Sequence, residues 1–180
     1  MRTEERHATP EYEEETSLLL PLLKKDPKNQ PLRRIFARST FAMIEASCAF
    51  LRGVIVSEFD KNPGVFTFLE EVALREQMPR LEDGSIQEVK ARFRTVELIL
   101  FTLNMVARFA EENAIDHKSK EWSNFKSALN LRNRLTHPHI ASDWIVSDGE
   151  YRSLLDAAVW YRQTVGHLLE EILKYGHVYE

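Results

Sequence analysis

The sequence predicts an all-α fold, an up-and-down helical bundle of four or five main helices, and three observations lead to this prediction. Apolar residues recur at alternating steps of three and four along three long stretches, which is the spacing of one helix face. No stretch of useful length alternates apolar and polar residues as a half-buried strand does. With 180 residues, 43% of them apolar, the chain is long enough to bury one sizeable core.

The first two expected helices lie in the first third of the chain. Residues 11–25 are expected to form a helix that is interrupted at Pro21, which lacks an amide donor. Residues 31–58 form the second helix, with Gly53 as a weak point because glycine destabilises helix interiors. The single cysteine, Cys48, lies in this helix among apolar and small residues, so no intramolecular disulfide is expected and a reducing cytoplasm fits best.

Two further helices are predicted in the middle of the chain. The shorter one begins at Pro63, with Asn62 as its N-cap, and ends before Pro79. The longer one begins at a capping box of Ser85 and Glu88, whose side chains satisfy unpaired amides at a helix start. Its apolar stripe consists of Ile86, Val89, Phe93, Val96, Leu100, Leu103, Ala107 and Ala110.

The last two expected helices complete the bundle. Residues 119–136 are predicted to be helical, and the final helix follows a second capping box, Ser147 with Glu150, and ends near Gly176. The side chains expected to face inward from the first of these helices are Trp122, Phe125 and Leu129. Several aromatic side chains are left to face outward, where a homodimer would bury them. These are Phe109, Trp144, Trp160 and Tyr161.

Charge is unevenly distributed along the chain. The formal net charge is -4, and residues 1–15 alone carry two arginines and six glutamates, so the rest of the chain is neutral. We therefore expect an acidic, flexible tail over residues 1–15 and a single helical domain over residues 16–180. Between Lys118 and Arg134, five basic residues stand against one acidic residue, a local excess that attracts polyanions.

The sequence also indicates where the protein works. No apolar run approaches the roughly 20 residues that a membrane span needs. The amino-terminal segment lacks the basic and then apolar order of a signal peptide. We therefore expect a cytoplasmic protein that does not associate with a membrane.

One segment stands out as a candidate site: the run from Arg132 to His137, which closes an expected helix and is followed at once by Pro138. The spacing of an arginine five residues before a histidine is not distinctive by itself, because it occurs four times in the chain. The four pairs are Arg2 with His7, Arg132 with His137, Arg134 with His139, and Arg162 with His167. Only the second pair combines an asparagine, Asn133, with a helix end.

The residue types in this segment suit phosphodiester chemistry. On an ideal helix Arg132 and His137 lie about 140° apart, whereas Asn133 and His137 share a face. Pro138 ends the helix at His137, where the negative end of the helix dipole favours a protonated imidazole. His137 is thus suited to general acid and base catalysis, and the guanidinium of Arg132 to the charge that builds on a phosphate under attack.

The segment LRNRLTHP at a helix end, in a helical chain, resembles the HEPN superfamily (higher eukaryote and prokaryote nucleotide-binding domains). Its signature is an arginine, usually followed by a polar residue such as asparagine, then three or more residues and a histidine. The resemblance implies a metal-independent endoribonuclease without a cofactor, with the catalytic residues Arg132, Asn133 and His137 paired across a homodimer. It also implies RNA as substrate and a role as a toxin, with an antitoxin protein as partner, or in phage defence.

Other residues and functions stay open alongside this interpretation. The side chains expected to bind flanking RNA are Lys126, Arg134 and His139; the last stands where one toxin branch has a tyrosine. A second function is a non-catalytic module that binds RNA, a nucleotide or a protein partner. A third interpretation is structural: Arg132 pairs with Glu121 or Asp143 and simply finishes the helix. A metal site of His137, His139 and Asp143 is the weakest alternative, since its histidines lack a helical spacing. Glu45 is expected either to pair with Arg38 or Arg132, or to face water.

Overall fold

A computed structural model of the chain describes residues 9–59 and 64–175, and in them the fold is mostly helical. These residues contain six α-helices and one two-stranded antiparallel sheet. The chain folds into two compact units. Unit 1 comprises Met1–Ser47 and Asp116–Glu170, and unit 2 comprises Cys48–Ile115 and Glu171–Glu180. The expectation of a single domain over residues 16–180 stays a prediction.

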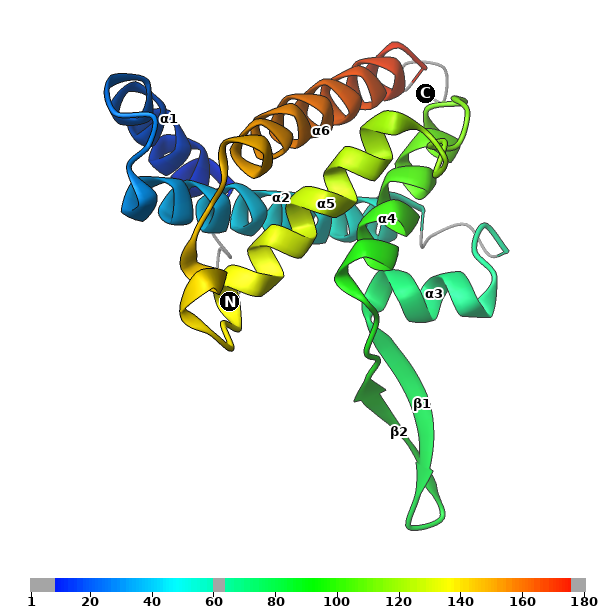
Figure 1. Cartoon of the computed structure of the whole chain (residues 1–180). Coiled ribbons are helices and arrows are strands. Elements are labelled where there is room, and N and C mark those ends of the chain that lie inside the picture. Colours follow the sequence, from blue (N-terminus) through cyan, green and yellow to red (C-terminus); the bar gives the residue numbers. More distant parts are fainter. Residues whose placement is uncertain (1–8, 60–63, 176–180) are drawn as a thin grey trace. The chain divides into compact units, whose positions relative to one another are not determined.

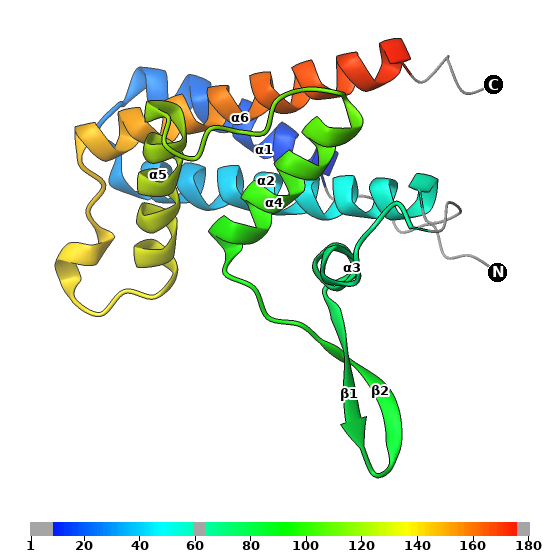
Figure 2. The ribbon, with the colours of Figure 1, turned by 90° about the vertical axis from the view of Figure 1, so that its right-hand side faces the viewer.

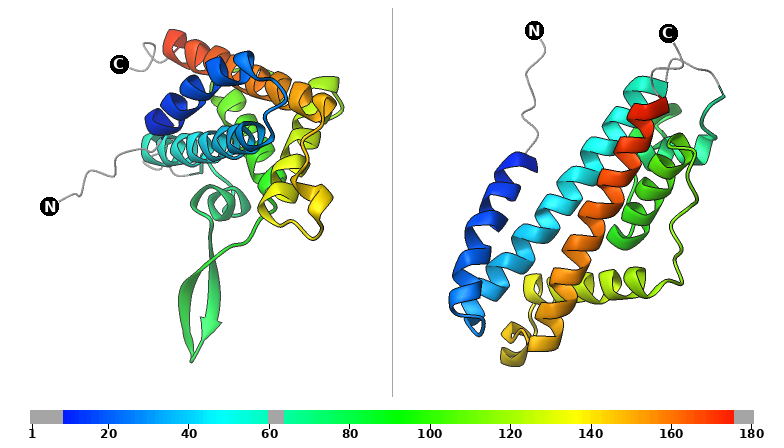
Figure 3. Two further views of the ribbon diagram at one scale, coloured as in Figure 1. Left: turned by 60° about the vertical axis from the view of Figure 1, so that its left-hand side comes forward. Right: turned by 90° about the horizontal axis from the view of Figure 1, so that it is seen from above.

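Unit 1 is built from helices. These are α1 (Thr9–Lys25), the first part of α2 (Gln30–Phe59), α5 (Lys120–Thr136) and most of α6 (Asp148–Tyr175), with a short 3-10 turn, η1 (Ala141–Trp144), before α6. α1 turns back along α2, and α6 runs beside α2 in the same direction, as Figures 1 and 3 show. α5 lies across α2, and its C-terminal end leads into the segment 137–147 that returns to α6 (Figure 1).

The core of unit 1 is aromatic. Phe125 of α5 is fully buried and lies edge-on to Phe41 of α2, with ring centroids 5.7 Å apart. On its other sides it contacts Trp122, Trp160 and Tyr161. Aromatic rings in such offset and edge-on arrangements attract one another beyond the burial of their area. This cluster fixes α5 against the helices that flank it.

Arg33 anchors the beginnings of α2 and α6 to each other. Its side chain is buried, and it donates from Nε to the carbonyl oxygen of Pro27 (2.6 Å), from Nη1 to that of Val146 (2.7 Å) and from Nη2 to Oδ1 of Asp148 (2.5 Å). Its guanidinium also lies 4.9 Å from the ring centroid of Tyr151. A buried cation with several partners of this kind is costly to leave unpaired, so these contacts specify the geometry of the helix starts.

Unit 2 carries the sheet. It contains the second part of α2, then α3 (Phe68–Arg75), β1 (Gln77–Glu82), β2 (Ser85–Lys90) and α4 (Thr95–Phe109). The two strands form a hairpin that extends away from α3 and returns into α4 (Figure 2). Arg52 of α2 is buried and donates to Oγ1 of Thr102 and to Oε1 of Glu76, which joins α4 and the α3–β1 junction to α2.

The hairpin overturns two expectations. Residues 85–90 do not begin a helix, and the expectation of no strand is wrong: β1 and β2 pair with Leu81 opposite Ile86. The reason is the turn, where Asp83 and Gly84 both have positive φ angles, 50° and 74°, as a two-residue hairpin turn requires. Ser85 donates its hydroxyl to the Glu82 carbonyl and caps no helix. A short apolar run fits both periods, and here the turn decides between them.

Three other predicted boundaries differ. The predicted helix from Pro63 to residue 78 is replaced by α3, which begins after a capping box of Thr67 and Glu70; Asn62 and Pro63 lie outside the described residues. Pro79 lies in β1. α1 begins at Thr9 and continues through Pro21, so residues 9–15 are helical and only the earlier part of the expected tail lies outside the described residues.

Four predictions are confirmed. α2 covers residues 31–58, and Cys48 is buried in it. α5 matches the predicted bounds, with the Ser119 hydroxyl accepting from the Trp122 amide. The side chains that were expected to face inward from α5 are buried. The capping box of Ser147 and Glu150 starts α6, whose last described residue precedes Gly176.

One helix among the described residues is long and apolar enough to cross a membrane by length and composition, over Gln30–Ser57 of α2. Half of its apolar window is buried inside the structure, and a core helix of a soluble protein passes the same test. The expectation of a protein away from membranes therefore stays a prediction.

Two glycines are expected to respond oppositely to alanine. A Cβ at Gly53, inside α2, meets no atom within 4 Å, so Gly53→Ala should stabilise the protein by about 1 kcal/mol through helix propensity. Gly84 has φ of +74°, so Gly84→Ala should destabilise the hairpin by about 1 kcal/mol. Chemical denaturation measures both changes. Equal effects of the same sign would contradict the hairpin geometry.

Candidate functional site

The candidate site lies in unit 1, at the C-terminal end of α5. The helix is held by its buried face, and it ends at Thr136 because Pro138 disfavours helical geometry for the residue before it. His137 is the C-cap, with φ of -127° and ψ of 64°, and its amide donates to the Asn133 carbonyl at 3.0 Å. The predicted helix end is therefore confirmed.

Arg132 and Asn133 come together with a third residue, Glu45 of α2. Nη2 of Arg132 lies 2.9 Å from Oε2 and 2.8 Å from Oε1 of Glu45. Nη1 of Arg132 donates to Oδ1 of Asn133 at 3.1 Å. Glu45 is therefore the partner of Arg132, as one of the expectations for it proposed. The structural interpretation named Glu121 or Asp143 as the partner of Arg132, and neither forms an ion pair with it in the described residues.

Burial and the charge of Arg132 have opposite effects on the pKa of Glu45. Burial raises the pKa of Glu45 above its ordinary value of 4.5, and the nearby Arg132 guanidinium lowers it, with burial the larger effect. Oε1 is buried and accepts no hydrogen bond, although it lies within ion-pair distance of Arg132. Because the arginine satisfies this carboxylate only in part, the pair is sensitive to the loss of either member.

His137 is open to solvent. Its side chain is exposed and makes no hydrogen bond to a described residue. The neighbouring Thr136 uses its hydroxyl to bond the Arg132 carbonyl, one turn earlier, at 2.9 Å. No direct contact joins His137 to the Arg132 guanidinium among the described residues. The imidazole is thus accessible to a ligand, and the guanidinium is fixed to α2 and to Asn133.

The three residues expected to bind flanking RNA are placed differently. Lys126 is exposed on α5. Arg134 donates from Nη2 to the carbonyl of Ile145 and to Oε1 of Glu150, at 3.2 Å and 2.5 Å, so its guanidinium fastens the segment before α6. His139 is exposed, and its amide donates to Oδ2 of Asp143 at 2.7 Å. Of the three, only Lys126 and His139 have side chains that make no hydrogen bond to a described residue.

Asp143 closes the loop after the helix. Hydrogen bonds from the amides of His139 and Ile140 hold the pKa of Asp143 below its ordinary value of 3.8, and the charges of Arg134 and His139 add to the effect. The carboxylate is therefore engaged with the backbone. No group of three or more potential metal ligands occurs in the part of the chain that the structure describes, so the alternative of a site with His137 and His139 has no geometric support.

The sequence did not indicate a cluster next to this helix end. Arg38 of α2 donates from Nη2 to the carbonyl of Leu135 at 2.8 Å. Its guanidinium and that of Arg34 lie 5.4 Å and 5.6 Å from the ring centroid of Trp144 in η1. Arg34 also donates to the Trp144 carbonyl at 3.1 Å. The spacing of Arg34 and Arg38, four residues apart on one helix face, is the only signal that the sequence offered for this cluster.

The aromatic residues expected on the surface are mostly buried or covered. Tyr161 is 2% exposed and donates to the Ile44 carbonyl, so its expected outward position is wrong. Trp160 packs against Phe125 in the core of unit 1. Phe109, in unit 2, packs against Phe66. Trp144 alone among the four is substantially exposed, at 38%.

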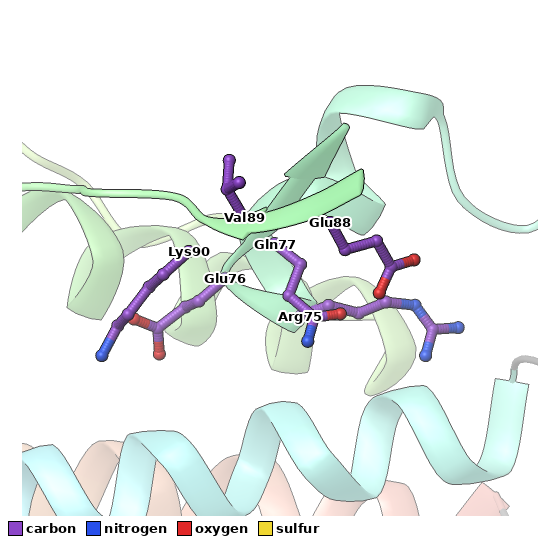
Figure 4. Close-up of a pocket in the computed structure, with 6 residues that line it drawn as sticks. All are labelled: Arg75, Glu76, Gln77, Glu88, Val89 and Lys90. Atoms are coloured by element: carbon purple, nitrogen blue, oxygen red, sulfur yellow. The ribbon is translucent and has the colours of Figure 1, made fainter. Parts of the chain in front are cut away.

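Among the described residues of unit 2 lie a larger and a smaller hollow, and neither is lined by a motif residue. The larger measures about 330 Å³ and lies at the base of the hairpin, as Figure 4 shows, with Glu76 and Lys90 at one end and Arg75 and Glu88 at the other. The smaller measures about 230 Å³ and lies between α3 and the hairpin. Their linings mix both signs of charge and do not indicate a particular ligand.

In comparisons with known proteins, no family model, no curated protein and no solved structure matches the chain.

The raised pKa of Glu45 predicts how the free energy of unfolding changes with pH. Because its pKa is raised in the folded protein, the native state takes up the proton more readily, so Glu45 lowers the free energy of unfolding as pH rises above 4.5. Denaturant titrations between acid and neutral pH, on wild type and Glu45→Gln, should show the wild type losing stability relative to the variant as pH increases. A relative gain with pH would contradict the burial of this carboxylate.

Proposed function

We propose that the protein is a HEPN-like, metal-independent endoribonuclease whose catalytic residues are Arg132, Asn133 and His137. The observation that supports this proposal is the arrangement at the end of α5: an exposed imidazole on the C-cap, one turn from a guanidinium that Glu45 and Asn133 hold in place. A permanently charged fork and a titratable ring are the groups that phosphodiester cleavage by an internal hydroxyl requires.

The proposed reaction is attack by a ribose 2′-hydroxyl on the adjacent phosphorus. The bond from the 2′-oxygen to phosphorus forms, the bond to the 5′-oxygen breaks, and a 2′,3′-cyclic phosphate and a 5′-hydroxyl result. In a homodimer whose motifs face each other, one His137 accepts the proton of the 2′-hydroxyl and the other supplies a proton to the leaving oxygen. Arg132 stabilises the charge that accumulates on the phosphorane oxygens.

Glu45 is the positioning residue in this proposal. A free arginine side chain samples many rotamers, and holding its fork from two sides removes that freedom before substrate binds. The guanidinium has five donors, and its Nε donates to no described residue, so donors are left for a phosphate. Asn133 shares this work, and its exposed side chain can shift to a phosphate oxygen.

One observation favours the second function, a non-catalytic module that binds RNA, a nucleotide or a protein. The ion pair with Glu45 offsets the charge of Arg132, and Arg134 is engaged with Glu150. With Arg132 and Arg134 paired in this way, the site would bind an anion through its other cationic side chains, such as that of Lys126. It would not supply a guanidinium to stabilise a phosphorane. The two functions differ in one measurable property, the appearance of a cyclic phosphate.

The cellular setting is proposed on the resemblance alone. A cytoplasmic toxin or phage-defence protein would cleave cellular or phage RNA, and an antitoxin protein would hold it inactive until needed. No cofactor enters the proposed reaction.

Cleavage of RNA by the wild-type protein in EDTA is the direct test. His137→Ala should reduce the rate by about 10²- to 10⁴-fold, since it removes the proton carrier. Arg132→Lys keeps the charge and loses the fork, so a loss of comparable size is expected. Labelled RNA, with the cyclic phosphate identified by mass spectrometry, reports both changes.

The matched control for these variants is His167→Ala, which removes a histidine from α6 in the same unit. It should cleave like the wild type. Equal cleavage by wild type and His137→Ala, or no cyclic phosphate from any preparation, would reject the catalytic proposal. In the second case, retained RNA binding would support the non-catalytic module.

The proposed homodimer predicts the molecular mass of the protein in solution. Light scattering after size exclusion should give twice the chain mass of 21.0 kDa at the concentrations where cleavage occurs. Mixing His137→Ala with wild type should lower activity more steeply than dilution of active chains, because mixed dimers hold one imidazole. A monomer with full activity would overturn the proposed composite site.

A further inference from the structure

Trp144 is an aromatic side chain that the fold exposes and yet holds in place. It is 38% exposed and lies in η1, outside the aromatic core. Its backbone carbonyl accepts from Nη1 of Arg34, and two guanidinium groups lie over its ring. A ring fixed in this way keeps part of its surface available without losing conformational entropy on binding.

The two arginines at this ring retain their positive charge. Neither Arg34 nor Arg38 forms an ion pair with any residue that the structure describes, and Arg38 is exposed. Each spends one donor on a backbone carbonyl and keeps others for a ligand. This pair therefore differs from Arg33, Arg132 and Arg134, whose guanidiniums are each bound to a carboxylate.

The cluster is attached to the proposed catalytic segment. The hydrogen bond from Arg38 to the Leu135 carbonyl joins it to the last turn of α5, two residues before His137. The acidic residue next to Trp144 in the chain, Asp143, directs its carboxylate to the amides of His139 and Ile140. Two guanidiniums therefore lie at the ring, and the nearest acidic side chain in the sequence is engaged elsewhere.

We infer that Arg34, Arg38 and Trp144 form a subsite for one unpaired nucleotide of single-stranded RNA, with the base on the tryptophan ring and the adjacent phosphate on the guanidiniums. This inference rests on the proposed function for the identity of the nucleic acid. An aromatic ring stacks with any base, but only where the base is free of a duplex, because paired bases keep their faces inside the helix. The subsite therefore selects unpaired RNA beside His137.

The experiment measures binding apart from cleavage. All proteins carry His137→Ala, and the probe is a fluorescein-labelled oligouridylate, alone or annealed to an oligoadenylate, titrated by fluorescence anisotropy. Trp144→Leu, which keeps apolar bulk at the site, should weaken single-strand binding by about tenfold, and Trp144→Phe, which keeps a stacking ring, should restore most of it. The duplex should bind more weakly and respond little to either variant.

Substitution of Arg34 or Arg38 should change the salt dependence of binding. Single-strand affinity falls with salt with a slope of about 0.7 per neutralised phosphate, so Arg34→Gln and Arg38→Gln should each lower that slope by about this amount. Trp144→Leu should weaken binding without changing the slope. Arg162→Gln, an exposed arginine on α6, is the matched control and should change neither quantity.

The outcomes separate this inference from the proposed function. Single-strand binding that is absent, or that is equal in His137→Ala alone and in His137→Ala combined with Trp144→Leu or Trp144→Phe, overturns the subsite, whether or not the wild type cleaves RNA. Binding that depends on Trp144, together with no cyclic phosphate from the protein with His137 intact, supports the subsite and rejects catalysis. Binding lost equally in Trp144→Leu and Trp144→Phe also overturns the stacking role, since it indicates a loop that needs tryptophan for its own fold.

Discussion

The backbone of Val146 is the point on which unit 1 depends. Its carbonyl accepts from both Gln30 and Arg33, and its amide donates to the Gln30 side chain, so α2 holds this residue from two directions. The side chain of Val146 is fully buried beside them. Val146 lies near the end of the segment 137–147, so these bonds hold that segment to α2 just before α6 begins. The exposed His137 and the exposed Trp144 lie at the start of the segment and two residues before Val146.

Five arginines near the candidate site fall into two groups that differ in their partners. Arg33, Arg132 and Arg134 are bound to Asp148, Glu45 and Glu150, and Arg33 and Arg134 also donate to backbone carbonyls. Arg34 and Arg38 are bound only to carbonyls and to one aromatic ring. A carboxylate partner offsets the charge of each arginine in the first group, so attraction of a polyanion depends mainly on the second group and on exposed side chains such as that of Lys126.

Much of the local structure followed from the sequence. The bounds of α5, the capping box before α6 and the termination at His137 depend on residues within one turn of each other, and these were predicted correctly. The hairpin was missed because Ile86 and Val89 fit a helical stripe, whereas Asp83 and Gly84 carried the stronger turn signal. The candidate site was found from its residues, and its partner Glu45 was named among alternatives. The Trp144 cluster was not found.

The sequence by itself determined most of the helices, where α5 stops, and which residues of phosphodiester chemistry collect at that end. Those properties depend on caps, proline and apolar spacing, all of which act over a few residues. Tertiary structure alone decided that Glu45 neutralises Arg132, that Arg134 serves the loop, and that Arg38 and Trp144 meet beside His137. Such pairings join residues far apart in the chain, and only the packing of α5 and η1 against α2 selects among the possible partners.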